Sequence, residues 1–345
     1  MAPWPDWPRR ATSCYDLVSE ASFGKAIEMI LRLAVGLTLT YTLPAQVLYV
    51  ASLSTDAATT ITVLNAATGA RLGQTLTRSG GLAVASDGRT YFATDVNGSS
   101  VAAYAGGTVQ LQGTGGTGGS PIAIALAPNG ARLYVAAAGG GIVSVHDART
   151  FQLLSSVTAG FSPTAIVVHP DNSRFYVANS SDREVAVFNA VNSRLIKRLK
   201  ITGGPVALTF LNNRILLALD SGAEAVTRID TEEDTLDGSY PVGPEPVAMA
   251  LASNGRLLVS NSSDSILRVF NGATGQPVST INLPPCRWIR CSVMSLAIDG
   301  NTVYAANSNQ QEVFAANLTS GEITATYSVP AGPRWLAVAP ATPNN

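Results

Sequence analysis

Two short elements in the C-terminal part of the chain combine arginine with tryptophan. One lies between two cysteines, in Cys286-Arg287-Trp288-Ile289-Arg290-Cys291, and the other is Arg334-Trp335. A guanidinium donates paired hydrogen bonds to carboxylates and phosphates, and an indole ring stacks on flat or cationic groups. The candidate residues for binding an anion or a sugar ring are therefore Arg287, Trp288, Arg290, Arg334 and Trp335. The alternative is a stapled surface loop whose tryptophan covers the rim of the molecule.

The spacing of Cys286 and Cys291 suits a disulfide that closes a small loop, provided that the chain folds in an oxidising compartment. A zinc site is a poor alternative, because no second Cys or His pair supplies the remaining ligands. The third cysteine is Cys14, and the chain holds no C-x-x-C-H, which excludes covalent c-type haem.

The two histidines, His146 and His169, are interpreted as structural. His146 stands in a strand at a position where other repeats carry Phe or Ile, and His169 stands in a turn. The chain holds no G-x-S-x-G motif, and the apolar runs predicted as innermost strands contain no Asp or Glu. No catalytic residue is assigned, and neither a metal nor a cofactor is expected.

Other polar or glycine-rich groups are given structural interpretations as well. Asn179, Asn261 and Asn307 are each expected to cap a strand end by bonding the backbone of their own loop. Lys197, Arg198 and Lys200 are expected as exposed charge on an outer strand. The stretch 113–121 (GTGGTGGSP) is expected as a loop, and it lacks the lysine and the following helix of a P-loop.

Composition excludes several classes of protein. The 345 residues are 46% apolar and only 13% charged, with 22 Lys+Arg against 23 Asp+Glu. A net charge of −1 argues against a nucleic-acid binder, which needs clustered cations. No run of 18 or more apolar residues follows the N-terminal region, so a polytopic membrane protein is excluded.

The N-terminal residues 1–46 are interpreted as a leader. Residues 33–43 (LAVGLTLTYTL) form a short uncharged apolar core after Arg32, as in a signal peptide, and translation is expected to start at Met29. The alternative is an uncleaved N-terminal tail. The rest divides into one domain, 47–340, and a short tail, 341–345.

Residues 47–340 contain an internal repeat of 40–46 residues. Each unit has an apolar anchor, then segments of alternating polarity, and then a short, continuously apolar run. The anchors are LYVAS (48–52), YFAT (91–94), YVAA (134–137), YVAN (176–179), LLAL (216–219), LVSN (258–261) and YAAN (304–307). The apolar runs, such as PTAIVVHP (163–170), are predicted to be strands buried on both faces.

Seven units of four antiparallel strands predict an all-β fold, a seven-bladed β-propeller. The repeat region opens with an anchor and closes with the apolar run 334–340. The C-terminal strand is therefore expected to complete the first blade. The end of the molecule at which the innermost strands begin is called the top.

The stretch YVANSSDREVAVFNAVNSRLI (176–196), followed by GGP and an apolar strand, resembles the YVTN repeat. That family of seven-bladed propellers includes surface-layer-type proteins, and the resemblance covers roughly residues 47–340. Three anchors depart from the motif at its asparagine. The stretch HPDNSRFYVAN (169–179) also resembles repeats of the lactonase family, which shares the fold. The resemblance implies a ligand site at the top.

These observations favour a secreted, periplasmic or cell-surface propeller that acts as a non-catalytic binding scaffold. Its expected partner is a protein, glycan or small-molecule ligand of the cell envelope, bound at the top. We expect a monomer that has no nucleic-acid partner and no transmembrane domain once the leader is removed. The alternative is an extracytoplasmic lactone hydrolase of the 6-phosphogluconolactonase type.

Overall fold

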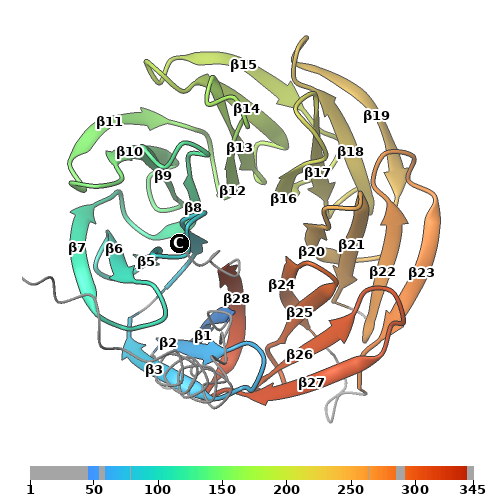
Figure 1. The fold of residues 1–345 in the computed structure, drawn as a ribbon. Coiled ribbons are helices and arrows are strands. Elements are labelled where there is room, and N and C mark those ends of the chain that lie inside the picture. Colours follow the sequence, from blue (N-terminus) through green and yellow to red (C-terminus); the bar gives the residue numbers. More distant parts are fainter. Residues whose placement is uncertain (1–45, 54–58, 78, 263, 285–291, 340–345) are drawn as a thin grey trace, which may run out of the picture. The chain divides into compact units, whose positions relative to one another are not determined.

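A computed structural model of the chain describes residues 46–53, 59–77, 79–262, 264–284 and 292–339. These residues form 28 β-strands, arranged as seven four-stranded antiparallel sheets. Figure 1 shows the sheets as blades around a common centre. The predicted seven-bladed propeller is confirmed.

The blades are numbered in chain order, starting from the one that contains β1. The innermost strands are β28 (Gly332–Ala339), β4 (Leu82–Val84), β8 (Pro121–Leu126), β12 (Pro163–Val168), β16 (Pro205–Phe210), β20 (Pro246–Leu251) and β24 (Val293–Asp299). The second strands are β1 (Val47–Leu53), β5 (Thr90–Asp95), β9 (Arg132–Ala137), β13 (Arg174–Asn179), β17 (Ile215–Asp220), β21 (Arg256–Asn261) and β25 (Thr302–Asn307). The third strands are β2 (Thr59–Asn65), β6 (Ser100–Ala105), β10 (Ile142–Asp147), β14 (Glu184–Asn189), β18 (Ala225–Asp230), β22 (Ile266–Asn271) and β26 (Glu312–Asn317). The outer strands are β3 (Arg71–Leu76), β7 (Leu111–Gly116), β11 (Leu153–Thr158), β15 (Leu195–Lys200), β19 (Thr235–Pro241), β23 (Pro277–Asn282) and β27 (Ile323–Ser328).

The two ends of the repeat region meet in the first blade. Strand β28 pairs with β1 along its length, with Val50 opposite Leu336 and Tyr49 opposite Ala337. In Figure 1 the dark red β28 lies beside the blue β1. The C-terminal strand therefore completes the first blade, as the order of the repeats predicts. This pairing ties both ends of the ring together.

The most buried strands are the second strands, and this corrects a prediction. Strand β13 is buried at every residue except Arg174, whereas the innermost β12 alternates between buried and partly exposed residues. The innermost strands were predicted to be buried on both faces because they are continuously apolar. They are edge strands with no further strand on the side of the ring centre, so their side chains stay partly exposed.

Aromatic side chains of the second strands fill the space between blades. The rings of Tyr49 and Tyr91, from the first and second blades, lie with their centroids 4.2 Å apart, and both residues are fully buried. Tyr134 and Phe175 form the corresponding contact between the third and fourth blades, at 4.8 Å. Such pairs hold neighbouring blades face to face.

The structure corrects one further sequence prediction, and other predictions fall on residues that it does not describe. The glycine-rich stretch from residue 113 is not wholly a loop, because its first four residues belong to the outer strand β7. The proposed leader, Met29, Cys14, Cys286 and Cys291 lie outside the described residues. Where the chain is described, no helix has the length and apolar character needed to cross a membrane.

Candidate functional site

Arg334 lies in a β-bulge at the top of the first blade. On β1, Ala51 faces Trp335 and Ser52 faces Pro333, so Arg334 is the extra residue between two paired positions. The same irregularity recurs at the second residue of five other innermost strands: Ile122, Thr164, Val206, Val247 and Met294. Arg334 is the charged member of this set. Bulges commonly reorient a side chain beside a site.

The side chain of Arg334 is exposed and lines a pocket of about 380 Å³ between the seventh and first blades. Within the described ranges it makes no hydrogen bond or ion pair. The pocket is lined by Leu53, Ser308, Asn309, Gln311, Pro330, Ala331, Gly332 and Arg334. A guanidinium beside neutral polar groups is suited to receive a carboxylate or a phosphate.

Of the other predicted site residues, the structure describes Trp335 but not the cysteine loop. Trp335 is partly buried and packs against the apolar cluster between the first and second blades. The other predicted site residues, Arg287, Trp288 and Arg290, lie outside the described residues, as does the proposed Cys286–Cys291 bridge. The structure therefore brings Arg334 to a pocket at the top and gives Trp335 a packing role.

A second top pocket, of about 330 Å³, lies between the third and fourth blades. Its floor includes Glu184, whose side chain is only 2% exposed and which pairs with both Arg198 and Lys200. Lys200 Nζ lies 2.9 Å from Glu184 Oε2. A buried carboxylate is tolerated only when cations neutralise it.

The basic side chains of β15 were expected as exposed charge, and Lys197, Arg198 and Lys200 are exposed. The pairing of Arg198 and Lys200 with a buried carboxylate was not predicted. Antiparallel pairing places Glu184 directly opposite Lys200, which is the signal that could have revealed the cluster from the sequence. Phe161, which is 74% exposed, stands at the edge of the same pocket. Arg198 and Lys200 both pair with the buried carboxylate of Glu184. This pocket therefore offers a ligand less unpaired positive charge than the pocket of Arg334.

The three asparagines that end anchor strands form hydrogen bonds with backbone groups, but not always with the backbone groups predicted. Asn179 Nδ2 donates to Ala159 O at 2.9 Å, and Asn261 Nδ2 donates to Pro244 O at 2.5 Å. Both acceptors lie in the connection that enters the blade rather than in the asparagine's own loop. Asn307 does accept from its own loop, through Asn309 N at 3.2 Å. Close packing at Asn179 also explains Gly160, whose φ is +148° and where a Cβ would come within 2.7 Å of Asn179 Cγ.

The histidines are enclosed between blades. His146 is fully buried, and its Nε2 lies 3.0 Å from Ser144 Oγ. Burial lowers the pKa of His146 from its ordinary value of 6.5, and a hydrogen bond with Phe151 O opposes this only in part. His169 is 8% exposed in the turn after β12, with Nε2 2.8 Å from Asn213 O of the next blade. Both positions agree with a structural role.

One carboxyl group lies on an innermost strand, where none was expected. Strand β24 runs one residue further than the predicted apolar run and ends at Asp299. The pKa of Asp299 is raised because burial disfavours its charged form. It stands at the bottom end of β24, away from Arg334. Across the described residues, no group of three or more His, Cys, Asp and Glu side chains could hold a metal ion.

Comparisons with solved structures agree with the propeller fold. A functionally unknown protein from Desulfotomaculum acetoxidans DSM 771 superposes with a TM-score of 0.73 at 14% identity, covering 86% of this chain and 99% of that one. Kuenenia stuttgartiensis hydrazine synthase gives a TM-score of 0.69 at 17% identity, covering 78% of this chain and 94% of that one. The β-propeller domain of Myceliophteria thermophila Cps50 (Swd1) gives 0.62 at 18% identity, covering 76% and 92%. At these identities the likeness shows the fold alone.

The sequence itself also matches a known family. No curated protein matches the chain. Residues 139–338, more than half of the chain, match the family described as outer membrane protein assembly factor BamB. The match begins after β9, within the third blade, and continues through the seventh blade into the closing strand β28, which includes Arg334. The chain therefore belongs to the outer membrane protein assembly factor BamB family.

Proposed function

We propose that this protein is an extracytoplasmic, non-catalytic scaffold that binds a partner protein of the cell envelope at its top. The observation that carries the proposal is Arg334, whose exposed guanidinium lines the 380 Å³ pocket without a partner among the described residues. A guanidinium in this setting recognises a carboxylate, such as an acidic side chain or a chain terminus of the partner.

Two further observations support a protein partner. The family's name describes an assembly factor, which acts on other proteins of the outer membrane. Repeats of the YVTN type, such as residues 176–196, and the leader core at 33–43 both fit a protein that works outside the cytoplasm. The proposal places the protein at the cell envelope as a monomer, with its top facing the partner.

The proposal is tested by photocrosslinking in the native host. A benzoylphenylalanine at Leu53, which lines the pocket of Arg334, is compared with one at Ala67, an exposed residue of the bottom turn of the same blade. We expect one discrete protein adduct from position 53 and none from position 67. Arg334→Gln is expected to abolish that adduct. The same adducts from both positions, or an adduct that persists in the Arg334→Gln variant, would contradict a partner at the top.

The alternative of a lactone hydrolase is tested with the same protein. The described lining of the Arg334 pocket supplies a cation and neutral amides and hydroxyls, but no carboxylate to act as general base. Purified full chain would be offered phosphosugar, aldono- and acyl-lactones, with and without divalent metal ions. Turnover that disappears in the Arg334→Gln variant would replace the scaffold proposal with an enzyme.

A further inference from the structure

At the bottom of the propeller, three blades are joined to the next by an arginine. In each, the first residue of the second strand donates from its guanidinium to a carbonyl oxygen in the turn between the third and outer strands of the following blade. The donor and acceptor pairs are Arg132 with Ala190, Arg174 with Thr231, and Arg256 with Leu318. Arg132 also donates to Val191 O at 3.0 Å.

At two more blade junctions, the carbonyl at the equivalent turn position accepts a hydrogen bond from a tyrosine hydroxyl. Tyr240 donates to Gly272 O at 3.2 Å, and Tyr327 donates to Ala66 O at 2.5 Å. The turn carbonyl is therefore a recurrent acceptor between blades. A donor from the preceding blade satisfies it at five of the seven junctions.

The junction between the second and third blades lacks this donor. Thr90 pairs with Ala105 in the second blade, just as Arg132 pairs with Asp147 in the third. Thr90 therefore occupies the position that an arginine has in three other blades. Phe92 likewise takes the position of Tyr134 and brings no hydroxyl. The corresponding carbonyl, Ala148 O, accepts no hydrogen bond from any residue that the structure describes.

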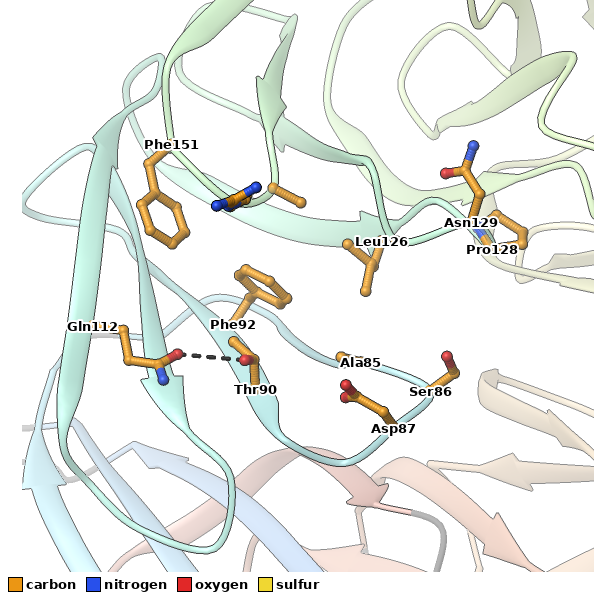
Figure 2. Close-up of a pocket in the computed structure, with 13 residues that line it drawn as sticks. Ala85, Ser86, Asp87, Thr90, Phe92, Gln112, Leu126, Pro128, Asn129 and Phe151 are labelled. Atoms are coloured by element: carbon orange, nitrogen blue, oxygen red, sulfur yellow. Dashed lines mark hydrogen bonds between the residues drawn. The ribbon is translucent and has the colours of Figure 1, made fainter. Parts of the chain in front are cut away.

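A pocket of about 530 Å³ lies at this junction, lined by Ala148 and by side chains of both blades. Figure 2 shows the rings of Phe92 and Phe151 and the side chain of Leu126 around it. The two ring centroids are 6.4 Å apart and the planes are inclined by 57°. On the second-blade side of the pocket, Thr90 donates its hydroxyl to Gln112 Oε1 at 3.3 Å (Figure 2).

Phe151 is held in an unusual backbone conformation to form this wall. Its φ is +62°, in the left-handed region that a bulky side chain rarely adopts. The equivalent turn positions in five other blades also have a positive φ, and they carry glycine or a small polar residue: Gly69, Ser193, Asp234, Gly275 and Gly321. Strain of this kind is characteristic of binding sites.

The rim of the pocket carries two uncommitted charges. Asp87 accepts one bond from Arg89 N at 2.9 Å, which leaves its second carboxylate oxygen without a described partner. Arg149 also lines the pocket, and its guanidinium makes no described hydrogen bond or ion pair. The open carboxylate, the carbonyl of Ala148 and the partly exposed ring of Phe151 all favour a cation, whereas Arg149 opposes one.

We propose that this pocket binds a guanidinium, presented by an arginine side chain of a partner polypeptide. The protein places its own arginines against the same turn carbonyl at three other junctions, so the acceptor geometry for a guanidinium is already built. Ala148 O would accept its N–H groups, Asp87 would neutralise its charge, and the partly exposed ring of Phe151 would pack against it. This site is at the bottom and does not depend on the function proposed for Arg334.

The test titrates the full chain with acetyl-arginine amide and, separately, with acetyl-citrulline amide, its neutral isostere, by calorimetry or NMR. We expect a Kd on the order of 1 mM for the arginine amide and binding about tenfold weaker for the citrulline amide. Asp87→Asn should weaken arginine-amide binding several-fold. Arg149→Ala should strengthen it, because a like charge is removed.

In the Thr90→Arg variant, the new arginine side chain should itself occupy the pocket. Its guanidinium would reach Ala148 O as Arg132 reaches Ala190 O, and probe binding should be lost while the melting temperature is kept. The matched control is Thr302→Arg, the same register position in the seventh blade, where Tyr327 already occupies the turn carbonyl of the next blade. That variant should bind the probe as the parent does.

Four results would overturn the proposal. The first is equal binding of the arginine and citrulline amides, and the second is no binding of the arginine amide at 20 mM, about 20 times the expected Kd. The third is binding of acetyl-aspartate amide that Arg149→Ala abolishes, which would make the pocket an anion site. Loss of the arginine amide in both Thr90→Arg and Thr302→Arg would also count against this location.

Discussion

The ring of Phe151 occupies the space that a side chain on Gly113 would need. An ideal Cβ on Gly113 of β7 would lie 2.4 Å from the Phe151 ring of the next blade. At the junction of the seventh and first blades the roles are reversed, since a Cβ on Gly69 would lie 2.6 Å from the ring of Tyr327. Each of these two junctions thus pairs one aromatic ring with one glycine. At the first, the glycine lies in the outer strand and the ring in the turn, and at the second the glycine lies in the turn and the ring in the outer strand.

This pairing predicts a strong interaction between positions 113 and 151. Gly113→Ala should destabilise the protein by about 1–3 kcal/mol, because the ring cannot move without disturbing β7. Adding Phe151→Gly should recover much of that loss, since glycine tolerates the positive φ. Urea unfolding of the two single variants and the double variant measures the coupling. The control is Gly116→Ala in the same strand, where a Cβ would meet no atom within 4 Å. Additive effects of the two substitutions would show that the pair is not coupled.

A second prediction concerns the pH dependence of stability through His146. Its pKa is lowered in the folded state because burial disfavours the charged ring. The unfolded chain therefore binds the proton more readily. The stabilisation is present above the unfolded value of about 6.5 and is lost as the pH falls through and below it. We expect the free energy of unfolding to fall less between pH 7.5 and pH 5.5 in His146→Gln than in the parent. Parallel pH profiles of the two proteins would refute this assignment.

A third prediction concerns the buried carboxylate of Glu184. Arg198→Ala should cost about 1–3 kcal/mol, because it leaves Lys200, which is 71% exposed, as the main counter-charge. The double variant Arg198→Ala/Glu184→Gln should be more stable than Arg198→Ala alone, since the uncompensated charge is gone. Arg194→Ala, an exposed residue just before the same strand, serves as the control and should change stability by less than about 0.5 kcal/mol. A double variant less stable than Arg198→Ala would contradict the charge argument.

A fourth prediction follows from the closure of the ring. Deleting residues 332–345 removes β28, which leaves β1 as an unpaired inner edge and removes the part of the contact between the first and seventh blades that β28 makes. We expect loss of a cooperative thermal transition in circular dichroism. Deleting only residues 340–345 should leave the transition within a few degrees of the parent, because the whole of β28 remains. A cooperative transition at the parent temperature after the longer deletion would show that closure is dispensable.

The repeat alone was enough to predict the fold. Alternation with a period of two specifies strands, and the regular spacing of the anchors specifies identical four-stranded units that can bury their faces only against one another. The position of the closing strand followed from the order of elements, because a chain that opens with a second strand needs a partner from its other end. These are local patterns, and each is readable without knowing what lies across a blade junction.

The tertiary structure decided which side chains form sites. Arg334 was a candidate from its residue type, but its exposure depends on a bulge in the pairing of β28 with β1. The Glu184 cluster and the pocket beside Phe151 join residues from different strands or blades, and their contacts depend on register and packing. The degree of burial of the innermost strands was mispredicted for the same reason. The sequence by itself determined the repeating unit and the number of blades, because hydrophobic periodicity is a local property. Only the tertiary structure decided where charge stays unpaired, because that depends on what the neighbouring blade presents across each junction.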